Sequence, residues 1–129
     1  MTQEDKELLL RDLCARLPYG VKATTTANGW RDVYVVSGYN DDRIYLDCPV
    51  YDEGDDEWLV ESVRPYLRPM SSMTEEEKKT YEMFFNEDGL LNTSIDTYLD
   101  WLLENHFDYR GLIKRGLAIE APEGMYNIK

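Results

Sequence analysis

Histidine and cysteine are scarce in this sequence of 129 residues, which contains one His and two Cys. The cysteines, Cys14 and Cys48, are far apart in the sequence, and neither has a second Cys or a His beside it. A structural zinc site needs four such ligands, usually in closely spaced pairs. The sequence therefore predicts no metal site and no cofactor, and we expect both cysteines to pack as small hydrophobic side chains.

Long hydrophobic runs are also missing. No segment approaches the roughly 20 apolar residues that a membrane-spanning helix requires. The first ten residues, MTQEDKELLL, carry acidic side chains where a signal peptide carries basic ones. We therefore expect a cytoplasmic protein with no membrane partner.

Basic side chains are too few to balance the acidic ones. The sequence has 14 Lys and Arg against 26 Asp and Glu, a net charge of -12. Such a field repels nucleic acid and anionic lipid and attracts basic proteins. We expect no direct nucleic-acid binding and a protein partner with a basic surface. The length and the hydrophobic content of 43% are those of a single domain, residues 1–129.

The segment YDEGDDEW, from Tyr51 to Trp58, concentrates the negative charge. An EF-hand calcium loop needs oxygen ligands at alternate positions, and counting from Asp52 places Gly54 on one of them. The calcium template therefore fails. We interpret the segment as a turn that is solvated by water.

Hydrophobic periodicity predicts the order of the elements. Apolar residues at helical spacing predict an N-terminal helix over residues 2–17, with Thr2 as its N-cap. The period then changes to two, and turn signals at 27–29 and 40–41 separate three strands. We expect these strands to form a three-stranded antiparallel meander.

The C-terminal half is expected to be helical. Pro65 and Pro69 argue against a central strand in this region, which we interpret as a short edge strand or an irregular crossing. Capping boxes predict helices that start after Thr74 and Thr93, and Asp108 is expected to cap a third, short helix. The expected fold class is α+β: an N-terminal helix, a three-stranded antiparallel meander and a helical C-terminal half.

The turns also set the register of the predicted sheet. A two-residue turn at Asn40 and Asp41 places Val35 opposite Leu46, and a three-residue loop at 27–29 keeps the aliphatic residues of the first strand on the same face. That face is expected to be core. Its residues are Val21, Ala23, Val33, Val35, Ile44, Leu46, Cys48 and Val50.

The opposite face is mixed and aromatic. We take its side chains as the candidate protein-binding site: Trp30, Tyr34, Tyr45, Asp47 and Tyr51. Trp and Tyr are enriched in protein interfaces, and nearby carboxylates suit a partner that offers Arg or Lys. The alternative is that a later helix covers this face and makes its aromatic side chains part of the core.

Two later segments carry a resemblance. They are residues 60–79, with RPYLRPMSSMTEEEKK, and residues 105–126, with HFDYRGLIKRGLAIEAPEGMY. Through them the sequence resembles small acidic proteins of gut-type bacteria and of their phages and mobile elements, over less than half of the chain. The resemblance brings no activity and no catalytic residue. It implies a phage or mobile-element setting, in which a small protein acts by binding.

Three hypotheses of function follow. The leading one is a non-enzymatic interaction protein that binds a basic protein surface through the aromatic sheet face. The first alternative is a nucleic-acid mimic that blocks a DNA-binding enzyme with carboxylates in place of phosphates. The second is an enzyme, whose pocket would gather His106 with an acid and a Cys or Ser.

Overall fold

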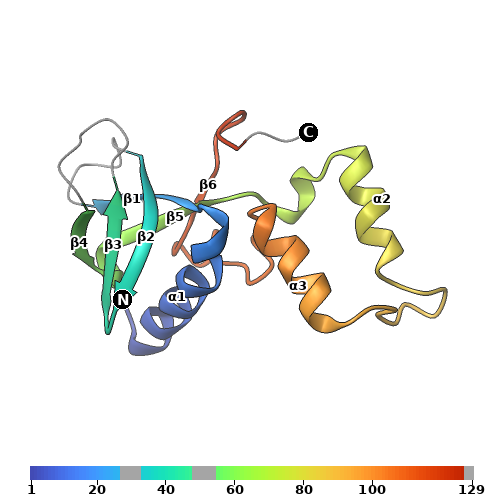
Figure 1. Ribbon diagram of the computed structural model, residues 1–129, viewed down its shortest axis with the longest axis horizontal. Coiled ribbons are helices and arrows are strands. Elements are labelled where there is room, and N and C mark those ends of the chain that lie inside the picture. The colour runs from blue at the N-terminus through green and yellow to red at the C-terminus, as the bar shows by residue number, and fades with distance from the viewer. Residues whose placement is uncertain (27–32, 48–54, 127–129) are drawn as a thin grey trace.

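The computed structural model describes residues 1–26, 33–47 and 55–126, and it shows an α+β fold built around one sheet (Figure 1). The strand order is β4-β3-β2-β1-β5-β6. Neighbouring strands are antiparallel except β5 and β6, which are parallel. The strands are β1 (Lys22–Thr25), β2 (Tyr34–Asn40), β3 (Arg43–Asp47), β4 (Asp55–Leu59), β5 (Val63–Leu67) and β6 (Ile119–Glu120). The three predicted strands pair as neighbouring antiparallel strands, but the sheet has six strands and not three, because later strands extend it on both sides.

Three α-helices start where hydroxyl side chains cap them. They are α1 (Gln3–Arg16), α2 (Glu75–Met83) and α3 (Ile95–Glu104). Thr2 accepts a hydrogen bond from the backbone N–H of Asp5, and Thr74 forms a full capping box with Glu77, as predicted. The N-cap of α3 is Ser94, one residue after the predicted Thr93.

The predicted third C-terminal helix is absent from the described part of the chain, where residues 109–118 form turns and bends. Asp108 does accept hydrogen bonds from the backbone N–H groups of Leu112 and Ile113, at 2.8 and 3.0 Å. Gly111 has a φ of +74°, however. A left-handed residue three positions after the cap ends any helix before it completes a turn.

Strand β2 is out of phase with the sequence prediction. The turn lies at Asp41 and Asp42, one residue later than predicted, because Asn40 pairs with Arg43. This change in the turn would by itself leave the side chains of β2 on their predicted faces. An irregularity between Val36 and Gly38 then inserts one extra residue. A bulge of this kind sends every earlier side chain of the strand to the opposite face.

Tyr34 and Val36 are therefore core, and Val33 and Val35 are not. Val36 pairs with Leu46, while Tyr34 pairs with Ala23 of β1 and is 4% exposed. Val33 is exposed and Val35 is half-buried. The aliphatic face was correct for Val21, Ala23, Ile44 and Leu46, which are fully buried. Cys48 and Val50 lie outside the described residues.

Strand β5 contradicts the reading of the proline-rich segment as an edge. It lies between β1 and β6 and contains Pro65, which is paired with Ala23. Strand β6 pairs only with Tyr66 and Leu67. Pro65 thus has a neighbouring strand on one side only, which is the situation in which a missing N–H group is tolerated.

Helix α1 packs on the inner face of the sheet. Leu9 and Leu13 belong to the same core cluster as the buried strand residues, with Val60 and Val63. Burial of each such side chain stabilises the fold by about 1.5–3 kcal/mol relative to exposure. Among helices of the described residues, none has the length and apolar character needed to cross a membrane.

Helices α2 and α3 form a hairpin that projects away from the sheet (Figure 1). Edge-to-face contacts of Phe84 with Tyr98 and Trp101, each 5.5 Å between ring centroids, hold the two helices together. The hairpin joins the sheet through backbone bonds on both sides of Arg68. Its N–H donates to the carbonyl of His106, and its carbonyl accepts from the N–H of Asp108, both at 2.8 Å.

Candidate functional site

The face of β2, β3 and β4 that points away from the core carries the part of the predicted binding site that is described. We call it the outer face, and its residues with described side chains are Val33, Val35, Asn40, Arg43, Tyr45, Asp47, Glu57 and Leu59. Val35 pairs with Asp47, and Tyr45 pairs with Glu57, so these pairs share a face. The two carboxylates are exposed, while Val35 and Tyr45 are half-buried.

The ring of Tyr45 packs closely against Gly38 of the neighbouring strand. A Cβ atom added to Gly38 would lie 3.3 Å from Cδ2 of Tyr45, closer than ordinary contact. Glycine at this position therefore gives room for the aromatic ring. Glu57 forms an ion pair of 3.5 Å with Arg43, whereas Asp47 forms no ion pair with another described residue.

The structure separates the five predicted binding residues. Tyr45 and Asp47 lie on the outer face, as expected, but Tyr34 points into the core because of the bulge in β2. Trp30 and Tyr51 lie outside the described residues. The sequence reading missed Val35 and Glu57 as members of this face. Glu57 was assigned to a solvated turn because β4 begins with three acidic residues, a residue type that is depleted in strands.

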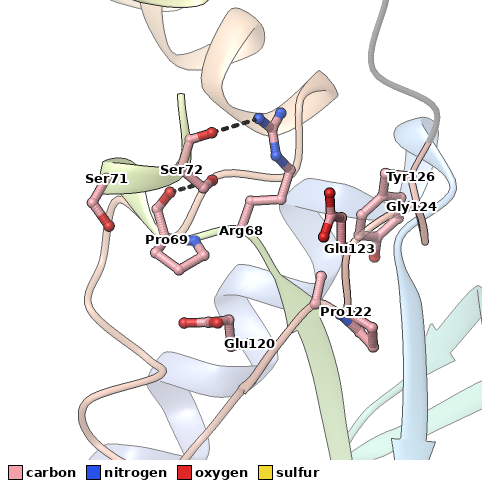
Figure 2. Close-up of a pocket in the computed structure, with 10 residues that line it drawn as sticks. Arg68, Pro69, Ser71, Ser72, Glu120, Pro122, Glu123, Gly124 and Tyr126 are labelled. Atoms are coloured by element: carbon pink, nitrogen blue, oxygen red, sulfur yellow. Dashed lines mark hydrogen bonds between the residues drawn. The ribbon is translucent and has the colours of Figure 1, made fainter. Parts of the chain in front are cut away.

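A cavity of about 320 Å³ lies between residues 68–72 and the C-terminal segment 120–126 (Figure 2). Pro69, Pro122 and Tyr126 contribute apolar surface, and Glu120 and Glu123 contribute carboxylates. Ser71 and Ser72 are also in its lining, but His106 is not. The cavity therefore lacks the combination of histidine, acid and hydroxyl that the enzyme hypothesis requires.

Arg68 borders the cavity, but its charge is already paired. Its Nη1 and Nη2 atoms donate to the two carboxylate oxygens of Glu77 at 2.8 and 2.6 Å. Hydrogen bonding to Arg68 lowers the pKa of the Glu77 carboxyl, so this group is a carboxylate at neutral pH.

His106 is a buried side chain with an unusual backbone. Its φ is +63°, and its ring stacks on that of Tyr126 with centroids 3.8 Å apart. Burial, followed by the charges of Arg16, Arg68 and Lys22, lowers its pKa to about 4. The imidazole is neutral at physiological pH, and a pKa this low makes it a weak general base.

Tyr126 fixes the C-terminal segment to the sheet. Its hydroxyl donates to the carbonyl of Tyr66 at 2.8 Å and accepts from the backbone N–H of Lys22 at 2.9 Å. Burial raises the pKa of this phenol to about 12, so it remains protonated and can donate. The Lys22 ammonium also donates to the carbonyl of Met125, at 2.9 Å.

In the described residues, the Cys14 thiol and the carboxylates do not form a recognisable reactive centre. Cys14 is a free, half-buried thiol, and burial raises its pKa, which disfavours the nucleophilic thiolate. Residues 1–26, 33–47 and 55–126 hold no group of three or more His, Cys, Asp or Glu side chains placed to bind a metal ion.

Comparison with known proteins gives no relative: no family model, no curated protein and no solved structure matches this chain.

Proposed function

We propose that this protein is a non-enzymatic interaction protein that binds a basic surface of another protein through the outer face. The observation that carries the proposal is the pairing of Tyr45 with Glu57, next to the exposed carboxylate of Asp47. An aromatic ring fixed by its backbone neighbour offers contact area at little entropic cost, and the carboxylates can pair with Arg or Lys. The phage or mobile-element setting is part of the same proposal.

The charge of the whole chain supports this choice of partner. With a net charge of -12, the protein accelerates encounters with a basic partner and slows encounters with acidic ones. Salt bridges at the rim of such an interface contribute mainly to the association rate. We therefore expect rapid, salt-sensitive binding.

Affinity capture with a matched pair of variants tests the proposal. The test variant is Tyr45→Ala with Asp47→Asn, on the outer face. The control is Tyr39→Ala with Asp41→Asn, which removes the same two chemical groups from exposed positions of the same β-hairpin. The wild type and the control are expected to retain a basic protein from a host lysate, and the test variant to lose it.

The retained protein is then purified and titrated against the three chains at low and high salt. Binding to the wild type should weaken as salt rises, because exposed charges are screened within about 10 Å at 0.1 M salt. Equal affinities of the wild type and the Tyr45→Ala, Asp47→Asn variant would overturn the proposal. Capture of acidic proteins alone would do the same.

A further inference from the structure

The distal end of the α2–α3 hairpin exposes hydrophobic side chains. We call residues 82–96 the hairpin tip; they comprise the end of α2, the connecting turn and the start of α3. Met83, Leu90 and Ile95 are 75%, 64% and 56% exposed. They are the three most exposed of the large hydrophobic side chains in the described residues. The tip lies on the side of the hairpin away from the sheet (Figure 1).

Backbone hydrogen bonds order the turn that carries Leu90. The N–H of Asn86 donates to the carbonyl of Leu90, and the N–H of Asn92 donates to the carbonyl of Phe84, both at 2.8 Å. The side chain of Asn86 accepts from the N–H groups of Asp88 and Leu90, at 2.9 and 3.0 Å. The exposure of Leu90 is therefore a property of a formed turn, and such a surface loses little entropy on binding.

Aromatic packing fixes the two helices that flank the turn. Phe85 lies 5.3 Å from Tyr81 and 5.6 Å from Tyr98, measured between ring centroids. Burial, followed by a hydrogen bond with Tyr81, raises the pKa of Tyr98 to about 12. These ring contacts thus hold the two helices together, and Met83, Leu90 and Ile95 take no part in them.

The charge of the tip itself is of one sign, and the nearest basic residues in the sequence, Lys78 and Lys79, lie one turn before it on α2. Residues 80–109 hold seven of the 26 acidic side chains of the chain and none of the 14 basic ones. Seven of the twelve net negative charges therefore fall in less than a quarter of the sequence. Four of the acids belong to the tip itself, and all four are exposed: Glu82, Glu87, Asp88 and Asp96.

We propose that the hairpin tip is a docking surface for a basic amphipathic segment of another protein, with apolar side chains next to Lys or Arg. Apolar groups of the partner would cover Met83, Leu90 and Ile95, and its cations would pair with the surrounding acids. A second copy of the chain would bring the same carboxylates and be repelled, as would an anionic membrane. The site is separate from the outer face and does not depend on the proposed function.

The probe is a synthetic amphipathic helix of Leu and Lys, about 14 residues long and fluorescently labelled. Its affinity is measured by anisotropy for the wild-type chain and for the combined variant Met83→Gln, Leu90→Gln, Ile95→Gln. Tyr39→Gln is the control, because it removes an exposed hydrophobic side chain from the sheet at a position outside the outer face. Circular dichroism and melting temperature establish that all three chains are folded.

The tip variant is expected to bind the probe at least tenfold more weakly than the wild type, and the control to bind it equally well. A second variant, Glu82→Gln with Glu87→Gln, should weaken binding and reduce its dependence on salt. Equal affinity of the tip variant and the wild type would overturn the proposal, as would equally tight binding of a Leu and Glu peptide. Dimerisation of the wild type that the tip variant abolishes would also overturn it, in favour of self-association.

Discussion

The carboxylate of Asp12 and the guanidinium of Arg16 form an ion pair of 2.8 Å, and both side chains are fully buried. The two residues lie one turn apart on α1, and Arg16 also donates a hydrogen bond to the carbonyl of Phe107 at 2.7 Å. Arg110 lies 3.3 Å from the second carboxylate oxygen of Asp12, without the geometry of a hydrogen bond. The pair therefore connects the first helix to the chain that follows α3.

Asp12→Ala is expected to lower the free energy of unfolding by about 3–5 kcal/mol, because it leaves the Arg16 charge buried without its partner. Replacing both residues by apolar ones, Asp12→Leu with Arg16→Met, should cost less than the single change. Urea denaturation measures both. The control is Glu57→Ala, which breaks the exposed pair with Arg43 and should cost less than about 1 kcal/mol. Equal losses for Asp12→Ala and Glu57→Ala would contradict the buried pair.

Tyr34→Ala and Tyr45→Ala should differ in stability, because the two rings lie on opposite faces of the sheet. Tyr34 is 4% exposed and belongs to the core cluster, so its truncation should cost about 3–5 kcal/mol. Tyr45 is half-buried, and its truncation should cost about 1 kcal/mol. Thermal unfolding of both variants checks this order. A larger loss for Tyr45→Ala than for Tyr34→Ala would contradict the bulge and favour the predicted register.

Tyr126→Phe removes the hydroxyl that links Lys22 to Tyr66. The backbone N–H of Lys22 and the carbonyl of Tyr66 lose a partner, and a loss of about 1–3 kcal/mol is expected. Tyr39→Phe removes a hydroxyl from an exposed ring and should change stability by less than about 0.5 kcal/mol. Guanidinium denaturation of the two variants provides the comparison, and indistinguishable midpoints would show that the Tyr126 contact contributes nothing.

His106 should make stability depend on pH between 6.5 and 4. The ordinary pKa of 6.5 falls to about 4 in the folded protein, so within this window the unfolded chain takes up a proton that the folded protein does not. The contribution of a neutral His106 is complete above pH 6.5. It falls by about 3 kcal/mol as the pH drops to 4, according to the 1.36 kcal/mol that corresponds to each pKa unit.

The variant His106→Asn isolates this effect. Asn does not titrate, and it tolerates the φ of +63° better than most residues. The wild type should lose more stability than the variant when the pH is lowered from 6.5 to 4, as measured by urea titrations at several pH values. A constant difference between the two chains across that range would mean that His106 is not kept neutral by its surroundings.

The elements that the sequence predicted best are those with local signals. The helix after Thr74 and the helix after Thr2 begin at their predicted caps, because a hydroxyl and the backbone N–H groups near it are close in sequence. The α+β class follows from the change of hydrophobic period. These features depend on residues within one or two turns of each other.

The predictions that failed depend on partners far away in the sequence. One extra residue in the bulge between Val36 and Gly38 reverses the faces of Tyr34 and Val35. A glycine inside a strand pattern, here Gly38, is a signal for a bulge that the prediction did not use. Pro65 was taken to exclude an inner strand. This prediction failed because β6 pairs with only part of β5, beyond Pro65, and the sequence does not show how far β6 extends. For the first reason the candidate site lost Tyr34, which is core, and kept Tyr45 and Asp47 among the described residues.

The contact of Lys22 with Tyr126 closes a loop of 104 residues. Chain synthesis proceeds from the N-terminus, so helix α1 and strands β1 to β3 emerge from the ribosome well before Tyr126 exists. Until then, the edge of β5 that later receives β6 has no parallel neighbour. This open edge is a place where a nascent chain can be recognised by a chaperone or can pair wrongly, and completing it is among the last steps in forming the native sheet.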